Sequence, residues 1–139
     1  MQTFLPYANY KQTAQCLDYR RLGKQRIECK QILNGLSGKS KGWTHHPATL
    51  MWTGYEYELC RYATDICEEW ITRGYKDQQL AWFAQEIETC PPTGKPSWLG
   101  STDFHLAHRS NLLRKDFAFY SKYNWNVPDD MEYVWPDNK

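Results

Sequence analysis

The stretch ATLMWTGYEYELCRYATDICEEWITR, residues 48 to 73, decides the fold class. Its apolar side chains recur every three or four residues, which is the spacing of one helix face. They are Met51, Trp52, Tyr55, Leu59, Tyr62, Ala63, Ile66, Trp70 and Ile71. Gly74 follows as a stop signal. The pattern predicts one long amphipathic helix over residues 48–73.

Helical spacing also occurs on both sides of this stretch. LDYRRLGKQRIECKQIL, residues 17–33, carries an apolar stripe that begins at Leu22 and extends to Leu36, and Asp18 is a suitable N-cap. We predict a helix from about 18 to 36, a third over 77–88 and a fourth over 103–115. Residues 117–139 form an aromatic, irregular tail. The predicted fold class is all-α: a compact single domain, residues 1–139, with two long helices.

Composition narrows the functional classes. The chain has 139 residues, of which 41% are hydrophobic and 24% charged, as is typical of a soluble globular protein. No apolar run is long enough to span a bilayer, and MQTFLPYANY is not a signal peptide, so we expect a cytoplasmic protein without membrane contact. The five cysteines lack metal-ligand spacing. We therefore expect reduced thiols, no metal site and no cofactor.

Charge is unevenly distributed along the chain. Residues 11–41 hold eight Lys or Arg against two acidic residues, whereas residues 56–88 hold eight acidic residues against three basic ones. A molecule polarised in this way suits a polyanion, DNA or a nucleotide, on its basic face. The alternative is a solvated charged helix without a ligand.

The basic helix offers the first group of candidate site residues. Residues three and four apart share a face, so its cations repel one another unless an anion lies between them. Phosphate suits this arrangement, because Arg binds it in a bidentate manner. The alternative is that Asp18 and Glu28 neutralise part of the cluster. The predicted ligand-binding residues here are Arg20, Arg21, Gln25 and Arg26.

Two further segments carry candidate binding residues. FHLAHRSNLLRKD, residues 104–116, offers side chains that hydrogen-bond phosphates and base edges. The helix dipole alone would explain the two cations at its end. KGWTHHP, residues 41–47, and the tail offer rings for stacking on a base. The candidates are His105, His108, Arg109, Ser110, Asn111, Arg114, Lys115, Trp43, His45, His46, Tyr133 and Trp135. We predict that both helices and these rings form one composite site.

LDYRRLGKQR and HPATLMWTGYEYELCRYATDICEEWITRGY together resemble the pyrimidine-dimer DNA glycosylase (endonuclease V) family, and in particular its uncharacterised bacterial and phage relatives. Residues 19–24 occupy the family's Tyr-Arg-Glu-Leu-Pro-Arg segment. The resemblance implies a compact all-α domain that acts in DNA repair. It also implies excision of a base by the α-amino group of a small N-terminal residue, while a Glu stabilises the cationic sugar.

Two positions depart from the family pattern. Residue 2 is Gln, which is too large for ordinary Met removal, and Arg21 stands where the family has its Glu. The inherited mechanism therefore cannot run unchanged. The candidate catalytic residues are Asp18, Glu28 or His108 as acid or base, and Lys24 as an imine-forming amine. The hypotheses are a glycosylase or lyase for a damaged or modified base, a non-catalytic binder of nucleic acid or nucleotide, and a protein-binding helical domain.

Overall fold

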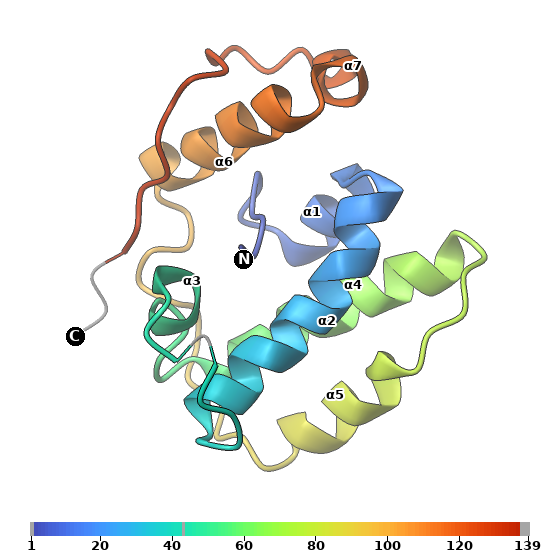
Figure 1. Ribbon diagram of the computed structural model, residues 1–139, viewed down its shortest axis with the longest axis vertical. Coiled ribbons are helices and arrows are strands. Elements are labelled where there is room, and N and C mark those ends of the chain that lie inside the picture. The colour runs from blue at the N-terminus through green and yellow to red at the C-terminus, as the bar shows by residue number, and fades with distance from the viewer. Residues whose placement is uncertain (1, 43, 137–139) are drawn as a thin grey trace.

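Two long helices, α2 (Tyr19–Leu36) and α4 (Glu56–Thr72), pack against each other at the centre of the computed structural model (Figure 1). The structure describes residues 2–42 and 44–136, and within those ranges the secondary structure is entirely helical. The fold class is all-α, as predicted. The other elements are α1 (Tyr10–Cys16), α3 (Pro47–Leu50), α5 (Gln79–Ile87), α6 (Thr102–Lys115), α7 (Phe117–Tyr120) and the 3-10 helix η1 (Ser121–Tyr123).

Helix α2 forms where the sequence predicts it. Asp18 is its N-cap, and the carboxylate accepts the Arg21 backbone N–H at 3.3 Å. The stripe that begins at Leu22 is buried against α4, which also packs on α1 and α5. The cations of α2 lie outside this stripe: Arg20, Arg21 and Lys24 border the cavity described below, whereas Arg26 pairs with Asp77.

The predicted helix over 48–73 is wrong as a single element. The chain forms α3, leaves the helix after Leu50 and begins α4 at Glu56. Gly54 adopts φ 82°, in the left-handed region that favours glycine, and this turns the chain. The turn directs Trp52 into the core, where its Nε1 donates to Thr3 Oγ1 at 3.0 Å. Apolar spacing continues across the turn, so periodicity alone did not reveal it.

The remaining predicted helices, 77–88 and 103–115, correspond to α5 and α6 with shifts of one or two residues. Helix α1 was not predicted. It is short, and Asn9 caps it by accepting the Gln12 N–H at 2.8 Å. The tail also begins with short helices, α7 and η1, before it becomes irregular. Elements of one or two turns are too short to show a periodic pattern.

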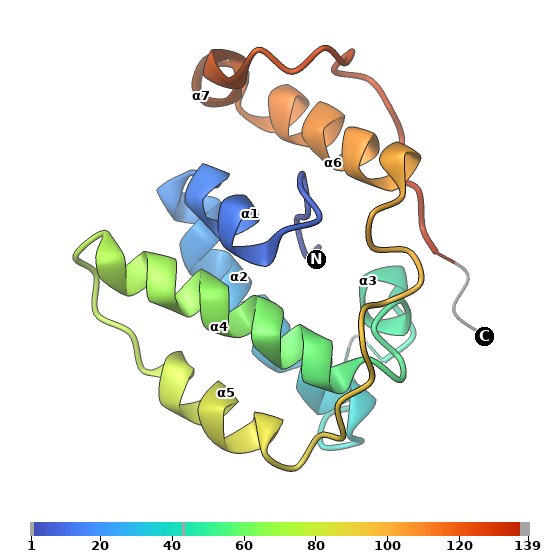
Figure 2. The ribbon, with the colours of Figure 1, turned by 180° about the vertical axis from the view of Figure 1, so that it is seen from behind.

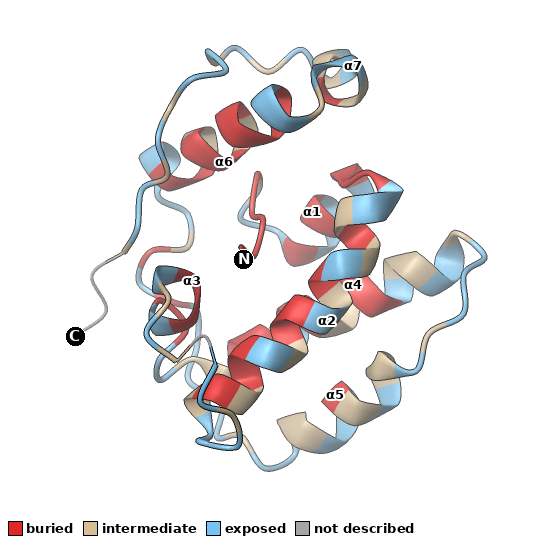
Figure 3. Cartoon of the chain, viewed as in Figure 1, coloured by how far each residue is buried: buried red, intermediate tan, exposed pale blue. Residues whose placement is uncertain are grey.

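An extended N-terminal segment, residues 2–6, lies between α6 and the pair α2 and α4 (Figures 1 and 2). It is buried (Figure 3), so its backbone groups need partners. No strand pairs with it in the described structure, and side chains supply the bonds instead. Phe4 N–H donates to Gln25 Oε1 at 3.0 Å, and Phe4 O accepts from Tyr62 Oη at 2.6 Å. This segment joins the two halves of the molecule.

The C-terminal tail runs back along α6 (Figure 1). Its attachment is Met131, whose N–H donates to Ser110 Oγ at 3.0 Å and whose carbonyl accepts from Asn111 Nδ2 at 3.0 Å. The described helices include none long and apolar enough to cross a membrane. All five cysteines carry free thiols.

Candidate functional site

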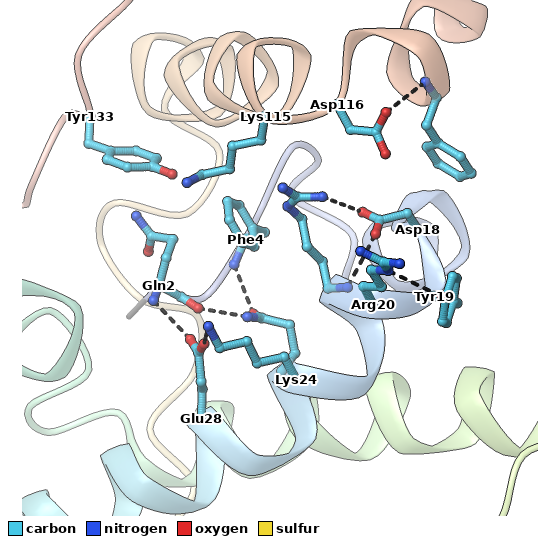
Figure 4. Close-up of a pocket in the computed structure, with 13 residues that line it drawn as sticks. Gln2, Phe4, Asp18, Tyr19, Arg20, Lys24, Glu28, Lys115, Asp116 and Tyr133 are labelled. Carbon is cyan, nitrogen blue, oxygen red and sulfur yellow. Dashed lines mark hydrogen bonds and ion pairs between the residues drawn. The ribbon is translucent and has the colours of Figure 1, made fainter.

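A cavity of about 610 Å³ opens between α2, the C-terminal end of α6, the N-terminal segment and the tail. Its volume lies in the range of about 300–1,000 Å³ that is usual for ligand pockets. Figure 4 shows side chains from all four parts of the chain around it. The lining residues are Gln2, Phe4, Asp18, Tyr19, Arg20, Arg21, Lys24, Gln25, Glu28, Lys115, Asp116, Phe119 and Tyr133.

Glu28 supplies a carboxylate on the α2 wall of the cavity. Its Oε2 accepts the backbone N–H of Gln2 at 2.9 Å, and its Oε1 lies 3.7 Å from Lys24 Nζ (Figure 4). One turn earlier, Gln25 Nε2 donates to Gln2 O at 2.7 Å. The Glu28 side chain is 9% exposed. Glu28 is therefore fixed in place and still borders the cavity.

Cations from two helices meet across the cavity. Lys24 and Arg21 come from α2, and Lys115 comes from the end of α6. Partial burial of the Lys115 ammonium, followed by the neighbouring charges of Arg21, Arg114 and Lys24, lowers its pKa. An anion bound between these like charges would relieve their repulsion. The cavity is thus suited to a ligand that carries phosphate.

Asp18 lies at the rim of the cavity but has other partners. Tyr120 Oη donates to its Oδ1, and Arg21 Nη1 lies 3.2 Å from the same oxygen. Burial opposes ionisation of this carboxyl, but the hydrogen bonds from Tyr120 and Arg21 outweigh it and lower the pKa. Both oxygens are engaged in capping α2 and fixing the tail. The candidate role of Asp18 as acid or base has no support in this geometry.

A family model for pyrimidine dimer DNA glycosylase matches residues 1–82. This chain belongs to the pyrimidine dimer DNA glycosylase family. The match covers more than half of the chain and includes α1 to α4, the N-terminal segment and the cavity face of α2. Neither a curated protein nor a solved structure matches the sequence.

The two histidines of α6 hold the N-terminal segment. Leu5 N–H donates to His108 Nδ1 at 2.9 Å, and Leu5 O lies 2.7 Å from His105 Nδ1. Burial, and then the proximity of His105, lowers the pKa of His108 to about 3, so its ring is neutral. His105 Nε2 accepts the Gly100 N–H at 2.9 Å. The sequence placed both rings on a ligand-binding face, and the structure instead buries them.

The neighbouring polar residues of α6 also hold chain segments. Arg109 Nε donates to Pro6 O at 2.8 Å, Ser110 and Asn111 bind Met131, and Arg114 donates to Asn111 Oδ1. Ser110 and Asn111 are fully buried. The prediction that this strip reads base edges does not fit their burial. Among the candidate binding residues predicted on α6, Lys115 is the one that lines the cavity.

The other predicted residues lie in several places. Arg26 forms an ion pair with Asp77 and lies 4.5 Å from the Trp70 ring, away from the cavity. His45 is exposed and His46 caps α3 through Ala48, and neither lines the cavity. Trp43 lies outside the described residues. Tyr133 forms one wall, whereas Trp135 packs beside it at a ring distance of 5.4 Å.

Several cavity residues were not among the predicted ones: Gln2, Phe4, Tyr19, Asp116 and Phe119. Gln2 and Phe4 belong to an extended segment without periodicity, so no local signal marked them. Tyr19 adjoins the basic cluster and, by that position, could have been included. Its Oη accepts from Arg20 Nε at 3.1 Å. Within the described residues, no group of three His, Cys, Asp or Glu side chains is arranged to hold a metal ion.

Proposed function

We propose that this protein excises a damaged base of the pyrimidine-dimer class from DNA, with Glu28 as the catalytic carboxylate. Membership of the pyrimidine dimer DNA glycosylase family supports action on DNA damage. The observation that carries the proposal is the position of Glu28, which borders a cation-lined cavity and accepts the Gln2 N–H.

Glu28 supplies the carboxylate that the sequence comparison with the family did not find. Arg21 occupies the family's Glu position, but its guanidinium pairs with Asp18. Glu28 lies seven residues, about two helical turns, further along α2, so both side chains project from the same face. Cleavage of a glycosidic bond develops positive charge on the sugar. A fixed carboxylate beside that sugar stabilises this charge.

The cations around Glu28 would bind phosphate groups of the DNA backbone. Lys24 and Arg20 lie on α2, Lys115 approaches from α6, and all three line the cavity. A duplex whose damaged nucleotide turns into the cavity would bring the flanking phosphates against them. Lys24 is also the side-chain amine nearest Glu28 in the described structure. We propose that, if the reaction proceeds through an imine, the deprotonated amine of Lys24 attacks C1′ of the sugar while the glycosidic bond breaks and the base takes up a proton from solvent.

The residues described, 2–42 and 44–136, serve this function as one domain in our proposal. The cavity requires α2 from the first half of the chain and Lys115 and Tyr133 from the second half. Neither half has a complete site alone.

The test is cleavage of one glycosidic bond in a duplex with one cyclobutane thymine dimer, measured as an alkali-labile abasic site because the detached thymine stays joined to its neighbour through the cyclobutane ring. We expect abasic products from the wild type and a loss of at least about 100-fold in Glu28→Gln, the scale of losing one group that stabilises charge in the transition state. Glu88→Gln, at the exposed C-cap of α5 and outside the cavity, is the matched charge control. Borohydride treatment distinguishes an amine nucleophile, which leaves a covalent adduct, from water, which leaves none.

A wild-type protein that binds the duplex without forming an abasic site would contradict base excision. It would favour the non-catalytic binder instead. Equal activity of Glu28→Gln and Glu88→Gln would remove Glu28 from the mechanism.

A further inference from the structure

Two polar groups at the wall of the cavity have no hydrogen-bond partner among the described residues. They are Gln2 Nε2 and Tyr133 Oη, and both residues line the cavity. Figure 4 shows the two side chains projecting into the same part of it. A buried polar group without a partner is destabilising, so native structures rarely retain one without a reason. A bound ligand would supply the missing acceptors.

The orientation of the Gln2 amide is fixed by its neighbours. Gln2 Oε1 accepts the Thr3 N–H at 2.8 Å, so this end of the amide must be the oxygen and the other end the NH₂ group. The backbone N–H and carbonyl of Gln2 are bound to Glu28 and Gln25. The residue is 5% exposed. Gln2 therefore directs a pair of N–H donors at the cavity wall and has no other polar atom to offer.

Tyr133 presents a neutral hydroxyl at the same wall. Burial raises the pKa of Tyr133 to about 12, although Arg114 and Gln2 act in the opposite direction. The Gln2 side chain lowers this pKa as a neighbouring hydrogen-bonding group, but the geometry of the contact leaves neither Gln2 Nε2 nor Tyr133 Oη with a well-formed hydrogen bond. Met131, two residues earlier, is anchored to Ser110 and Asn111, and the His108 ring packs edgewise on Tyr133 at 5.4 Å. Tyr133 is positioned by packing, so its hydroxyl is available as a donor.

We infer that Gln2 and Tyr133 form a subsite that reads the edge of a base turned into the cavity, and that this subsite selects carbonyl oxygens. The Gln2 NH₂ group can only donate, and the Tyr133 hydroxyl can donate beside it, so together they match the carbonyls of a thymine- or uracil-type ring. The amino group of a cytosine-type ring would place donor against donor at Gln2. Phe4 lines the same cavity and supplies apolar surface for the plane of the ring. The inference rests on the proposed action on damaged pyrimidines and specifies which pyrimidines are favoured.

Phosphate is a less suitable occupant of this subsite. A phosphate group is drawn to the ammonium and guanidinium groups of Lys24, Lys115 and Arg21, which line the same cavity. Gln2 and Tyr133 carry no charge. Neutral donors are suited to the uncharged edge of a base. There the pattern of donors and acceptors, rather than charge, determines which ligand binds more tightly.

The test measures binding rather than turnover, so that it remains informative if no base is excised. The duplexes carry a uracil-type dimer, a cytosine-type dimer or an abasic analogue. A 2′-fluoro sugar at the target nucleotide destabilises the cationic sugar and blocks excision. The variants are Tyr133→Phe, which removes only the hydroxyl, and Gln2→Glu, which keeps the oxygen for Thr3 N–H but replaces the NH₂ donors. Tyr57→Phe on α4, outside the cavity, is the matched control.

We expect Tyr133→Phe to weaken binding of the uracil-type duplex about five- to tenfold, the effect of one neutral hydrogen bond. Binding of the abasic duplex should stay within about twofold, and Gln2→Glu should reduce or reverse the preference for uracil over cytosine. Equal losses on all three duplexes would overturn the inference, because Tyr133 would then contact the DNA backbone. Unchanged binding would also overturn it, because the two groups would then bond only each other. Thermal unfolding of each variant identifies a folding defect.

The outcomes separate this inference from the proposed function. Base selectivity that depends on Tyr133, in a wild type that releases no base, would retain the subsite and reject excision. Excision that is unaffected by Tyr133→Phe and by Gln2→Glu would retain the proposed function and reject the subsite.

Discussion

Gln2 donates its backbone N–H to Glu28 Oε2 at 2.9 Å, and this bond joins the N-terminal segment to the middle of α2. The same carboxylate is the proposed catalytic group. Its structural and chemical roles therefore require separate variants.

Glu28→Ala should destabilise the fold by about 1–3 kcal/mol, because it leaves the buried Gln2 N–H without an acceptor. Glu28→Gln retains an amide oxygen for this bond and should cost less than about 1 kcal/mol. Urea unfolding of both variants measures the difference in the free energy of unfolding. Equal stability of the two would show that the bond contributes little. Both variants should lose formation of the abasic site, since neither has a carboxylate at position 28.

Binding to DNA should weaken steeply with salt, because each neutralised phosphate releases counterions. Lys24→Ala and Lys115→Ala should each lower affinity and reduce the slope of log K against log salt by about one. Arg20→Ala should act in the same direction. Lys95→Ala, at an exposed position outside the cavity, is the control. Fluorescence anisotropy across a salt series gives both quantities, and an affinity independent of salt would favour the protein-binding alternative.

The protein should become less stable at low pH, because His108 must remain neutral to accept the Leu5 N–H. Burial lowers the pKa of this ring from 6.5 to about 3, so between those values the unfolded chain binds a proton that the folded chain does not. Stability therefore falls as pH decreases through this window, by up to about 1.4 kcal/mol per pH unit. His105 acts in the same direction, since burial lowers its pKa as well.

His108→Asn keeps an acceptor for Leu5 N–H but does not titrate. Its unfolding free energy should depend less on pH between 6.5 and 4.5 than that of the wild type. His45→Asn, at an exposed position, should leave the dependence unchanged. A pH profile of His108→Asn that parallels the wild type would show that this histidine is protonated in the folded state.

Gly23 allows α2 and α4 to approach closely. A Cβ at this position would lie 2.8 Å from atoms of the Trp70 ring. That ring stacks on Tyr75 at 4.2 Å and lies beneath Arg26, so it has little freedom to move. Gly23→Ala should destabilise the protein by about 1 kcal/mol, since overpacking costs about 1–3 kcal/mol and the gain in helix propensity is about 1.

Gly35→Ala provides the matched comparison on the same helix. Its added Cβ would have no neighbour closer than 3.6 Å, an ordinary contact. The free energy of unfolding of Gly35→Ala should equal or exceed that of the wild type. If both alanines are tolerated equally in thermal unfolding, the contact with Trp70 does not limit the packing of α2 on α4.

Local patterns were sufficient to predict the helices but not where a long one breaks. The stripe of α2 and its Asp18 cap are local features, and both were predicted from the sequence. The stretch 48–73 shows the limit of that reasoning. Apolar spacing continues across Gly54, whose positive φ separates α3 from α4, and the direction of Trp52 depends on Thr3, which is distant in sequence.

The α6 residues show a second limit. A sequence that contains two His, a Ser and an Asn on one helix is compatible with a binding face or with internal hydrogen bonding. The choice depends on what packs against the helix. Here an extended segment without a sheet partner lies beside it, and Leu5 uses both histidines for its own N–H and carbonyl. The polar residues of α6 therefore satisfy the backbone of the chain.

By itself, the sequence determined the helical class, the basic face of α2 and the similarity to the pyrimidine dimer DNA glycosylase family. These depend on spacing and residue type, which are local properties. Only the tertiary structure decided which side chains share the cavity. Glu28 borders the cavity beside Gln2 because the N-terminal segment folds back onto α2. Lys115 and Tyr133 line the same cavity because α6 and the tail pack over that segment. Contacts between residues far apart in the chain arise from packing the whole core, and no local pattern encodes them.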